Sequence, residues 1–280
     1  NIFPSNFVQP MSDASMLQII VIALFFGFGI LAAGKKAQPV ADFVNGMSEV
    51  CIKIMHMIIS IAPFGVFGLI TPVVATNGPD ILLPLLKLIL VAYLAMILHM
   101  VVVYSGMVKA IAKMGPLTFF KGQVRAMTFA FASASSVGTL PINMECSEKL
   151  GVRREVSSFV LPLGATINMD GTAIYQGVCA IFIAQVFGID LTIGQQCVIV
   201  MTAVLSSIGT AGVPGSGMIM LAMVLQSVGL PVEGIALVAG VDRVLDMMRT
   251  VVNITGDQSA AVCVDSLEKR KEARQAAKAA

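Results

Sequence analysis

The chain contains long stretches in which apolar residues follow one another without a charge. Residues 16–33 and 88–108 carry no Asp, Glu, Lys or Arg, and residues 47–75 are mostly Ile, Met, Val and Phe. About 20 apolar residues are needed for a helix to cross the hydrocarbon core of a bilayer. These three stretches therefore predict membrane-spanning helices, the second of them bent at Pro63 and Pro72.

Two later apolar stretches are interrupted by small, polar and helix-breaking residues. Residues 126–144 contain the sequence SASSVGTLP at 133–141, and the uncharged residues 191–232 contain GTAGVPGSG at 209–217. A continuous helix does not tolerate so much glycine and proline in one place. Non-helical backbone at membrane depth survives only inside protein or beside a water-filled cavity. Both stretches therefore predict re-entrant helical hairpins whose polar tips lie inside the protein.

The positions of Lys and Arg support this topology. With both hairpins re-entrant, the predicted outer loops, 76–80, 188–192 and 229–233, contain no Lys or Arg. Treating either hairpin as a single span would break this agreement with the positive-inside rule. The C-terminus is then cytoplasmic. The basic loops on the same side are those around Lys35–Lys36, Lys109–Arg125, Lys149–Arg154 and Lys269–Lys271.

Composition excludes a soluble domain. Hydrophobic residues make up 57% of the chain and charged residues 12%, and the mean hydropathy is +0.89. Soluble domains carry about 25% charged residues. We therefore expect an all-α integral membrane protein of several spans in the plasma or inner membrane. Its surroundings are the lipid bilayer, and no nucleic-acid partner is expected.

The last apolar segment, expected as one helix over about 234–264, has a polar face. An arc of about 100° on its helical wheel holds Asp242, Asp246, Arg249, Thr250, Asn253 and Asp257. Each ionised residue at mid-membrane costs about 2.5–3.5 kcal/mol unless it has a partner. Asp246 and Arg249 are three residues apart and could neutralise each other. Asn253 and Asp257 have no basic neighbour, and such oxygen ligands suit a hard cation.

A second polar motif lies in the middle of the span from 156 to 187. Residues 166–172 read TINMDGT, in which side-chain oxygens surround Gly171. A helix that unwinds at this point would expose backbone carbonyls as well, which again favours cation binding. The two hairpin tips offer hydroxyls and backbone N–H groups, which attract carboxylates.

Together these motifs carry a family resemblance. The sequences NMDGT at 168–172, GTAGVPG at 209–215 and DMMRTVVNITGD at 246–257 closely resemble the dicarboxylate/amino acid:cation symporter family, which includes glutamate and aspartate transporters. The resemblance is most specific from about 126 to 263. It implies an elevator-type secondary transporter, and a homotrimer of scaffold and transport domains.

The resemblance also implies a division of the chain. Residues 1–76 would be scaffold helices, the end of helix 4 and helix 5. Residues 77–265 would be the transport domain of helix 6, hairpin 1, helix 7, hairpin 2 and helix 8, and residues 266–280 a cytoplasmic tail. The chain starts with Asn-Ile-Phe-Pro, without an initiator Met or a signal segment. This start fits a fragment that lacks the first three helices.

Site roles follow from the same resemblance. Arg249 would hold the substrate's side-chain carboxylate and Asp246 its α-amino group. The remaining polar groups of the substrate would meet Ser135, Ser136, Thr172, Val213, Gly217, Thr250 and Asn253. One Na+ would lie among Gly164, Asn168, Asn253 and Asp257, and a second among Thr166, Ser207, Ile208 and Thr210. A third would use Asn168 and Asp170, with its other ligands on the missing third helix.

The implied function is sodium-coupled uptake of glutamate or aspartate, with no organic cofactor. Many relatives place a second arginine where this chain has Ala134 or Met247, so a C4-dicarboxylate or cystine symporter is the alternative within the family. Proton-coupled uptake is a further alternative. Gln176 stands where potassium-coupled animal glutamate transporters carry a glutamate, which argues against coupling of that type.

Two other classes of protein also bury charged residues in a membrane. An intramembrane aspartyl protease would use a pair such as Asp170 and Asp257, but its Gly-x-Gly-Asp signature fails at Ile254. A channel is disfavoured by the occluding hairpins. We therefore expect a transporter and no enzymatic activity.

Overall fold

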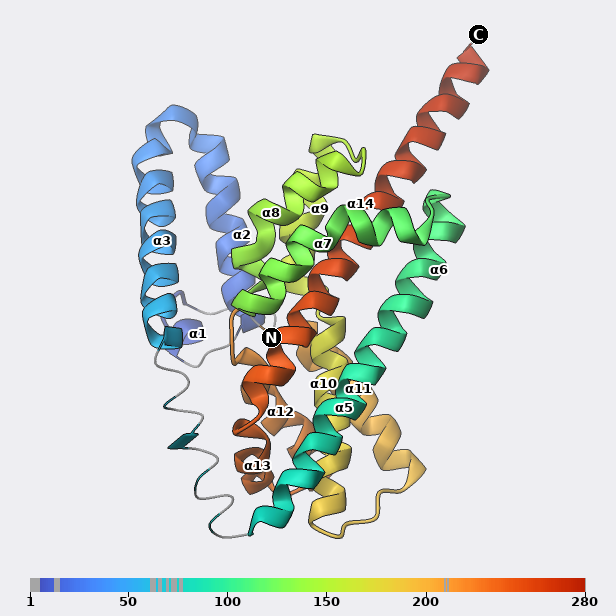
Figure 1. Ribbon diagram of the computed structural model, residues 1–280. Coiled ribbons are helices and arrows are strands. Elements are labelled where there is room, and N and C mark those ends of the chain that lie inside the picture. Colours follow the sequence, from blue (N-terminus) through green and yellow to red (C-terminus); the bar gives the residue numbers. More distant parts are fainter. Residues whose placement is uncertain are drawn as a thin grey trace. The chain divides into compact units, whose positions relative to one another are not determined.

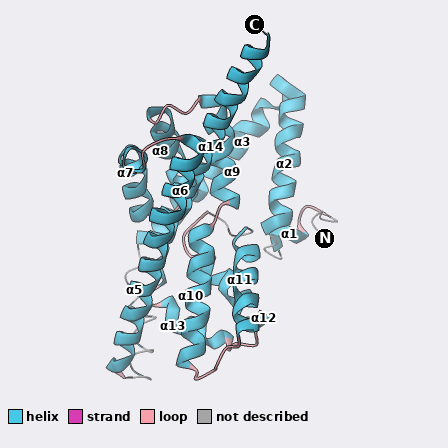
Figure 2. Cartoon of the chain, turned by 90° about the vertical axis from the view of Figure 1, so that its right-hand side faces the viewer, coloured by secondary structure: helices cyan, strands magenta, loops and turns pink. Residues whose placement is uncertain are grey.

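The structure is a computed structural model that describes residues 6–12, 16–60, 64, 67–68, 71, 75, 78–208, 210 and 212–279. Helices joined by loops make up these residues, with no strand among them, as Figure 2 shows. The all-α prediction is therefore confirmed. The chain divides into two compact units, residues 1–66 and 67–280.

The first unit consists of helices joined by a tight turn. Its elements are α1 (Gln9–Ser12), α2 (Met16–Ala33), η1 (Gly34–Ala37) and α3 (Gln38–Ser60). Helix α2 has the bounds of the first predicted span, whereas α3 begins well before residue 47. Gly34 has φ +60°, a conformation that favours glycine, and it begins the turn between α2 and α3. The bends predicted at Pro63 and Pro72 lie outside the described residues.

In the second unit, one long helical run meets the length and apolarity needed to cross a bilayer. It joins α5 (Leu82–His99), η3 (Met100–Tyr104), α6 (Ser105–Met107) and η4 (Val108–Ala112) into 31 residues. It is the one such run among the described helices, and it exceeds the predicted 88–108. Its length of about 46 Å is more than the roughly 30 Å of hydrocarbon. Leu86, Leu90 and Leu94 are exposed along it, as expected for a surface in contact with lipid or another apolar partner.

The first predicted hairpin is formed by α7 (Pro116–Ser133) and α8 (Ser136–Lys149). Ala134 ends α7 in the left-handed conformation, with φ 52°. Ser135 then caps α8, because its Oγ accepts a hydrogen bond from the Gly138 N–H at 3.0 Å. The turn is thus Ala134–Ser135, inside the serine-rich tip expected over 133–136. Pro141 lies inside α8.

The predicted unwinding point and second hairpin follow. Helices α9 (Arg154–Ile167) and α10 (Asp170–Val186) are separated by Asn168 and Met169, whose backbone is not helical. Helices α11 (Ile193–Ile208) and α12 (Ser216–Ser227) form the second hairpin. The 12 residues of α12 extend about 18 Å, too short to cross a bilayer. Residues 209 and 211 of its tip lie outside the described residues.

The prediction of one continuous last helix over about 234–264 is wrong at both ends. A short 3-10 turn, η5 (Val232–Gly234), and α13 (Ile235–Ala239) precede a break at Gly240–Val241, and α14 then runs from Asp242 to Ala279. Glycine is a poor helix former, and Asp242 gives α14 a carboxylate in its first turn, where the helix dipole favours negative charge. The tail from residue 266 continues this helix.

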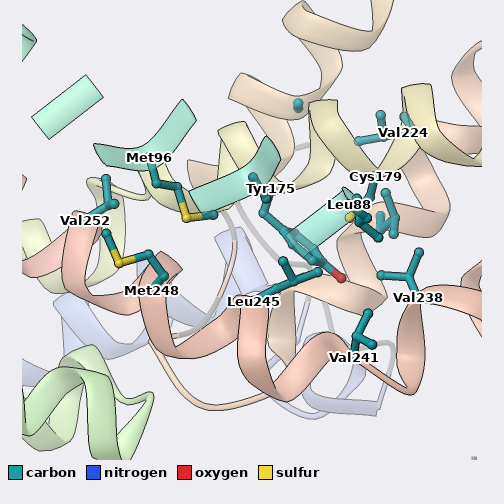
Figure 3. Close-up of a cluster of buried hydrophobic side chains, with 14 of the residues drawn as sticks. Leu88, Met96, Tyr175, Cys179, Val224, Val238, Val241, Leu245, Met248 and Val252 are labelled. Atoms are coloured by element: carbon teal, nitrogen blue, oxygen red, sulfur yellow. The ribbon is translucent and has the colours of Figure 1, made fainter. Parts of the chain in front are cut away.

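Helix α14 is the element on which the second unit is assembled. It contacts α5, α7, α8, α9 and α10, and Figure 1 shows the two hairpins approaching it from opposite ends. Buried side chains from several helices meet beside it. Figure 3 shows part of this core, with Leu88, Met96, Tyr175, Cys179, Val224, Val238, Leu245 and Met248.

Charged residues join the far end of α14 to α9 and to the α8–α9 turn. Arg153 donates to Asp265 and to Glu272, both at 2.7 Å, and Lys269 lies 2.6 Å from Asp265 and 2.9 Å from the Gly151 carbonyl. Burial on its own would raise the pKa of Asp265, but hydrogen bonds from Lys269 and Arg153 outweigh it and lower that pKa. The polar end of α14 is thereby fixed to the base of the first hairpin.

Candidate functional site

The polar face of α14 is buried among neighbouring helices. The side chains predicted to share this face are all at most 4% exposed: Asp242, Asp246, Arg249, Thr250, Asn253 and Asp257. The residues beside this face are equally buried, with Leu245 and Val252 at 0%, whereas Val244, on the opposite side of the helix, is 41% exposed. Buried polar groups need partners, so each of them must be accounted for.

Asp246 and Arg249 form the ion pair that their spacing allows. Arg249 Nη2 lies 2.5 Å from Asp246 Oδ1, while Asp246 Oδ2 accepts a hydrogen bond from the Gly215 N–H at 2.9 Å. Asp246 therefore joins α14 to the tip of the second hairpin. Arg249 lies over the Tyr175 ring, 5.1 Å from its centroid. Its Nη1 is buried and has no hydrogen-bond partner among the described residues.

Glycine at 217 lets the second hairpin lie directly against Arg249. A Cβ atom at this position would be 1.5 Å from Arg249 Nη1, which no side chain permits. Thr250, also predicted for the site, bonds the carbonyl of Asp246 at 2.9 Å within its own helix. Val213, at the hairpin tip, is half-buried.

The two hairpin tips contact each other. Ser135 Oγ donates to the Gly212 carbonyl at 3.2 Å, and the Val137 N–H donates to the same oxygen at 3.3 Å. Ser135 and Ser136 are 4% and 3% exposed. A Cβ on Gly212 would be 2.8 Å from the Ala165 carbonyl, so this tip also lies against the end of α9. The tips of both predicted hairpins therefore meet next to the end of α9, close to the break in the α9–α10 span.

The first predicted cation set is brought together in space. Asn168 Nδ2 donates to Asp257 Oδ1 at 3.1 Å and to the Asn253 carbonyl at 3.2 Å. Gly164 lies against the same carboxylate, because a Cβ at this position would be 2.5 Å from Asp257 Oδ1. Asp257 is 1% exposed, and none of the described ion pairs includes it. A buried carboxylate with only an amide donor is a strong attractor for a cation.

Asp170 lies on the same break and has two partners that the sequence analysis did not predict. Tyr104 donates to Asp170 Oδ2 at 2.8 Å, and His99 Nε2 lies 3.3 Å from the same oxygen. Both come from the long α5–η4 run. Thr172 follows Asp170 in α10 and lies 3.4 Å from Asn253 Nδ2, which ties this segment to α14.

The second predicted cation set is only partly assembled. The hydroxyls of Thr166, Ser207 and Thr210 bond the carbonyls of Leu163, Val204 and Ser206, each in its own segment. Ile208 is 37% exposed at the end of α11. Within the second hairpin the Thr210 N–H donates to the Ser207 carbonyl at 3.0 Å. The contact of Gly212 with Ala165 brings Thr166 near these residues, but no hydrogen bond between described residues joins Thr166 to the other three.

Among the described residues, no three His, Cys, Asp or Glu side chains cluster as a metal site. A cation held here must therefore be bound by amide, hydroxyl and backbone carbonyl oxygens together with one or two carboxylates. Such an oxygen set suits a hard ion and excludes a zinc-type centre.

Arg243 was missed in the sequence analysis. Its Nη2 donates to the Ala132 carbonyl at 3.0 Å and lies 3.5 Å from the Ser133 carbonyl, at the tip of the first hairpin. On the helical wheel it lies about 60° from Asp246, at the edge of the polar arc, so the same periodicity could have found it. Tyr175 donates to Asp242 at 2.7 Å. It lies on another helix, so the periodicity of the last helix could not have identified it.

Gly171→Ala is expected to destabilise the protein by about 1–3 kcal/mol. A Cβ at Gly171 would be 2.4 Å from the Arg249 carbonyl and 3.0 Å from Asn253 Oδ1, to which the Gly171 N–H donates. Gly177→Ala is the matched control in α10, since nothing lies within 4 Å of its added Cβ. It should be neutral or slightly stabilising. Thermal unfolding of both variants checks this, and equal melting temperatures would contradict the described packing.

Comparison with known proteins assigns the family. Residues 1–267 match the sodium:dicarboxylate symporter family. The chain is 40% identical over 268 residues to the "Proton/sodium-glutamate symport protein" of Bacillus subtilis (strain 168), covering 96% of this chain and 62% of that protein. It is 37% identical over 277 residues to the "Proton/glutamate-aspartate symporter" of Escherichia coli (strain K12), covering 99% and 63%.

A third relative carries a different substrate in its name. The "C4-dicarboxylate transport protein 1" of Ralstonia nicotianae (strain ATCC BAA-1114 / GMI1000) is 38% identical over 270 residues, covering 96% of this chain and 63% of that protein. The chain thus spans less than two thirds of the length of these relatives. The resemblance of its motifs is confirmed, and the family is one of membrane transporters rather than enzymes. The chain belongs to the sodium:dicarboxylate symporter family.

Proposed function

We propose that the protein is a secondary active symporter that couples sodium influx to uptake of an acidic amino acid, glutamate or aspartate. The observation that carries the proposal is the pair of carboxylates beside the α9–α10 break. Asp257 is buried with an amide as its hydrogen-bond donor, and Asp170 is bonded by a tyrosine and a histidine. Neither bonds an arginine or a lysine among the described residues.

The charge of the site supports cation coupling. The site brings together four aspartates, Asp170, Asp242, Asp246 and Asp257, and two arginines, Arg243 and Arg249, so the formal charge of these six side chains is −2. An acidic amino acid adds a further negative charge. Each uncompensated ionised group at mid-membrane costs about 2.5–3.5 kcal/mol. Cations bound with the substrate remove that cost, and this links their binding.

The substrate's chemistry follows from the pair on α14. Arg249 and Asp246 present opposite charges 2.5 Å apart, which suits a ligand that carries both a carboxylate and an ammonium group. Arg249 Nη1, not used by the pair, is a further donor for a carboxylate. The hydroxyls and N–H groups of Ser135, Ser136, Thr172, Val213, Gly217, Thr250 and Asn253 would serve the remaining polar atoms.

The cations would be divided between the sets described above. Gly164, Asn168, Asn253 and Asp257 would bind one Na+, Thr166, Ser207, Ile208 and Thr210 a second, and Asn168 and Asp170 a third. Coupled ions make uptake steep, because the membrane potential contributes about 2.3 kcal/mol per charge per 100 mV. Gln176 is uncharged, and its Oε1 accepts a hydrogen bond from Ser206 at 2.7 Å. An uncharged side chain at this position argues against countertransport of potassium.

Assembly and topology complete the proposal. Residues 1–76 would act as scaffold and 77–265 as the moving transport domain, in a homotrimer within the plasma or inner membrane. The basic helix end after residue 265 would lie in the cytoplasm, as the positive-inside rule predicts.

The alternatives are a C4-dicarboxylate or cystine symporter, and proton-coupled uptake. Asp246 argues against a substrate without an ammonium group. Uptake of labelled glutamate, aspartate, succinate and cystine into proteoliposomes tests all of them. We expect glutamate or aspartate uptake under an inward sodium gradient. Uptake that follows a proton gradient and ignores sodium would instead assign proton coupling, and preference for succinate would assign a dicarboxylate symporter.

A further inference from the structure

Arg243 lies where the first hairpin turns. The last carbonyls of a helix have no partner within the helix, and its C-terminus carries a partial negative charge. Arg243 donates to the Ala132 carbonyl at 3.0 Å and lies 3.5 Å from the Ser133 carbonyl. A cation from α14 therefore caps the C-terminus of α7.

The capped turn is strained and polar. Ala134, directly after the capped carbonyls, has φ 52°, a left-handed conformation that costs a residue with a Cβ about 1 kcal/mol or more. Ser135 follows it and bonds the Gly212 carbonyl of the other hairpin. Holding Ala132 and Ser133 in place therefore also holds Ser135 in its contact with the second hairpin.

The second hairpin is held by the complementary arrangement. Its α12 begins after Gly215, whose N–H donates to Asp246 at 2.9 Å. The N-terminus of a helix carries a partial positive charge, so a carboxylate is the matching partner. Within a single turn of α14, a cation thus binds the end of one hairpin helix and an anion the start of the other.

We propose that Arg243 is a positioning residue for substrate binding, which holds the tip of the first hairpin so that Ser135 and Ser136 face the substrate together with Asp246 and Arg249. The inference rests on the proposed symport. Arg243 Nη1 is buried and, among the described residues, has no hydrogen-bond partner. The guanidinium therefore has donor capacity beyond the cap, and it adds a second positive charge beside the proposed carboxylate site.

Arg243→Gln tests the proposal, because a glutamine is too short to reach the α7 carbonyls and carries no charge. In full-length protein in nanodiscs, hydrogen–deuterium exchange of the amides of residues 133–139 should become about 10-fold faster, while the amides of α10 stay unchanged. In proteoliposomes, the KM for the acidic amino acid should rise about 10-fold with the maximal rate within about 2-fold. Arg243→Lys keeps the charge, so its exchange rate and its KM should lie between those of Arg243→Gln and the wild type.

Arg154→Gln is the matched control, since the Arg154 side chain is 83% exposed on α9. It should leave the exchange and the KM at their wild-type values. Unchanged exchange of residues 133–139 in Arg243→Gln would overturn the proposal, and so would a lower maximal rate at constant KM. Should Arg243→Gln fail to fold, Arg243→Met, which keeps an unbranched side chain without the charge, takes its place, and wild-type exchange and KM in Arg243→Met would also overturn the proposal. If the wild type takes up no acidic amino acid, the proposed function fails, whereas the exchange result still decides whether Arg243 holds the tip.

Discussion

Asp257→Asn is expected to raise the sodium concentration required for half-maximal uptake by about 10- to 100-fold, the loss of a hydrogen-bonded ionic contact of about 1.5–3 kcal/mol. The amide keeps the shape of the side chain and an oxygen, but it removes the charge. Asp257 lies with Asn168, Gly164 and the Asn253 carbonyl, so its carboxylate supplies the negative charge of that set. Sodium titrations of glutamate uptake in proteoliposomes measure the shift.

Asp257→Asn weakens sodium binding, but it should stabilise the protein when sodium is absent. A buried carboxylate lacking a cation is costly, so Asp257→Asn should raise the melting temperature in sodium-free buffer. Wild-type protein should gain stability on adding sodium, as any ligand of the folded state produces, and the variant should gain much less. Asp190→Asn, in an exposed loop, makes the same chemical change and should alter neither response. An equal sodium-induced shift in Asp257→Asn and wild type would rule out a cation at this carboxylate.

The helices were largely predictable because bilayer insertion imposes strong composition rules. Residues 16–33 carry no charge and match α2, and the run after residue 82 exceeds its prediction because Lys87 and Lys109 lie within the observed helix. Long basic side chains near helix ends reach the interface, so a charge need not end a helix. The break at Gly240–Val241 was missed because a short apolar segment reads the same whether it continues a helix or kinks.

The site was predictable where its residues share one helix face. Asp246, Arg249, Asn253 and Asp257 lie at helical spacing, and helical periodicity groups them without knowledge of the fold. Tyr104 and His99 come from a helix more than 60 residues from Asp170 in sequence, and nothing local marks them as its partners. Contacts between helices depend on how the helices pack, and residue spacing within a single helix does not contain that information.

The predicted ion pair did not by itself decide between structure and binding. Asp246 and Arg249 do neutralise each other, as the simplest interpretation required. Yet Asp246 also accepts from the second hairpin, and Arg249 retains an unbonded Nη1 against Gly217 among the described residues. An ion pair that only stabilised the fold would not require glycine at position 217, where the second hairpin lies against Arg249. The two functions are separable by mutating one partner or both.

Arg249→Cys is expected to lower glutamate and aspartate uptake at least about 100-fold, since a buried carboxylate partner of this kind contributes about 3 kcal/mol or more. It should spare uptake of a small neutral amino acid such as serine, whose ammonium group still finds Asp246. Competition by unlabelled amino acids in proteoliposomes measures both. Arg154→Cys, on the exposed surface of α9, is the control and should transport as wild type.

Arg249→Cys alone also leaves Asp246 without its cation, which costs about 3–5 kcal/mol of stability, so lost uptake needs separating from unfolding. The double variant Asp246→Asn/Arg249→Cys removes both charges and should recover most of the melting temperature. If Arg249 binds the substrate's carboxylate, the double variant stays unable to take up glutamate although it is folded. Recovery of glutamate uptake together with stability would show instead that Arg249 serves only to neutralise Asp246.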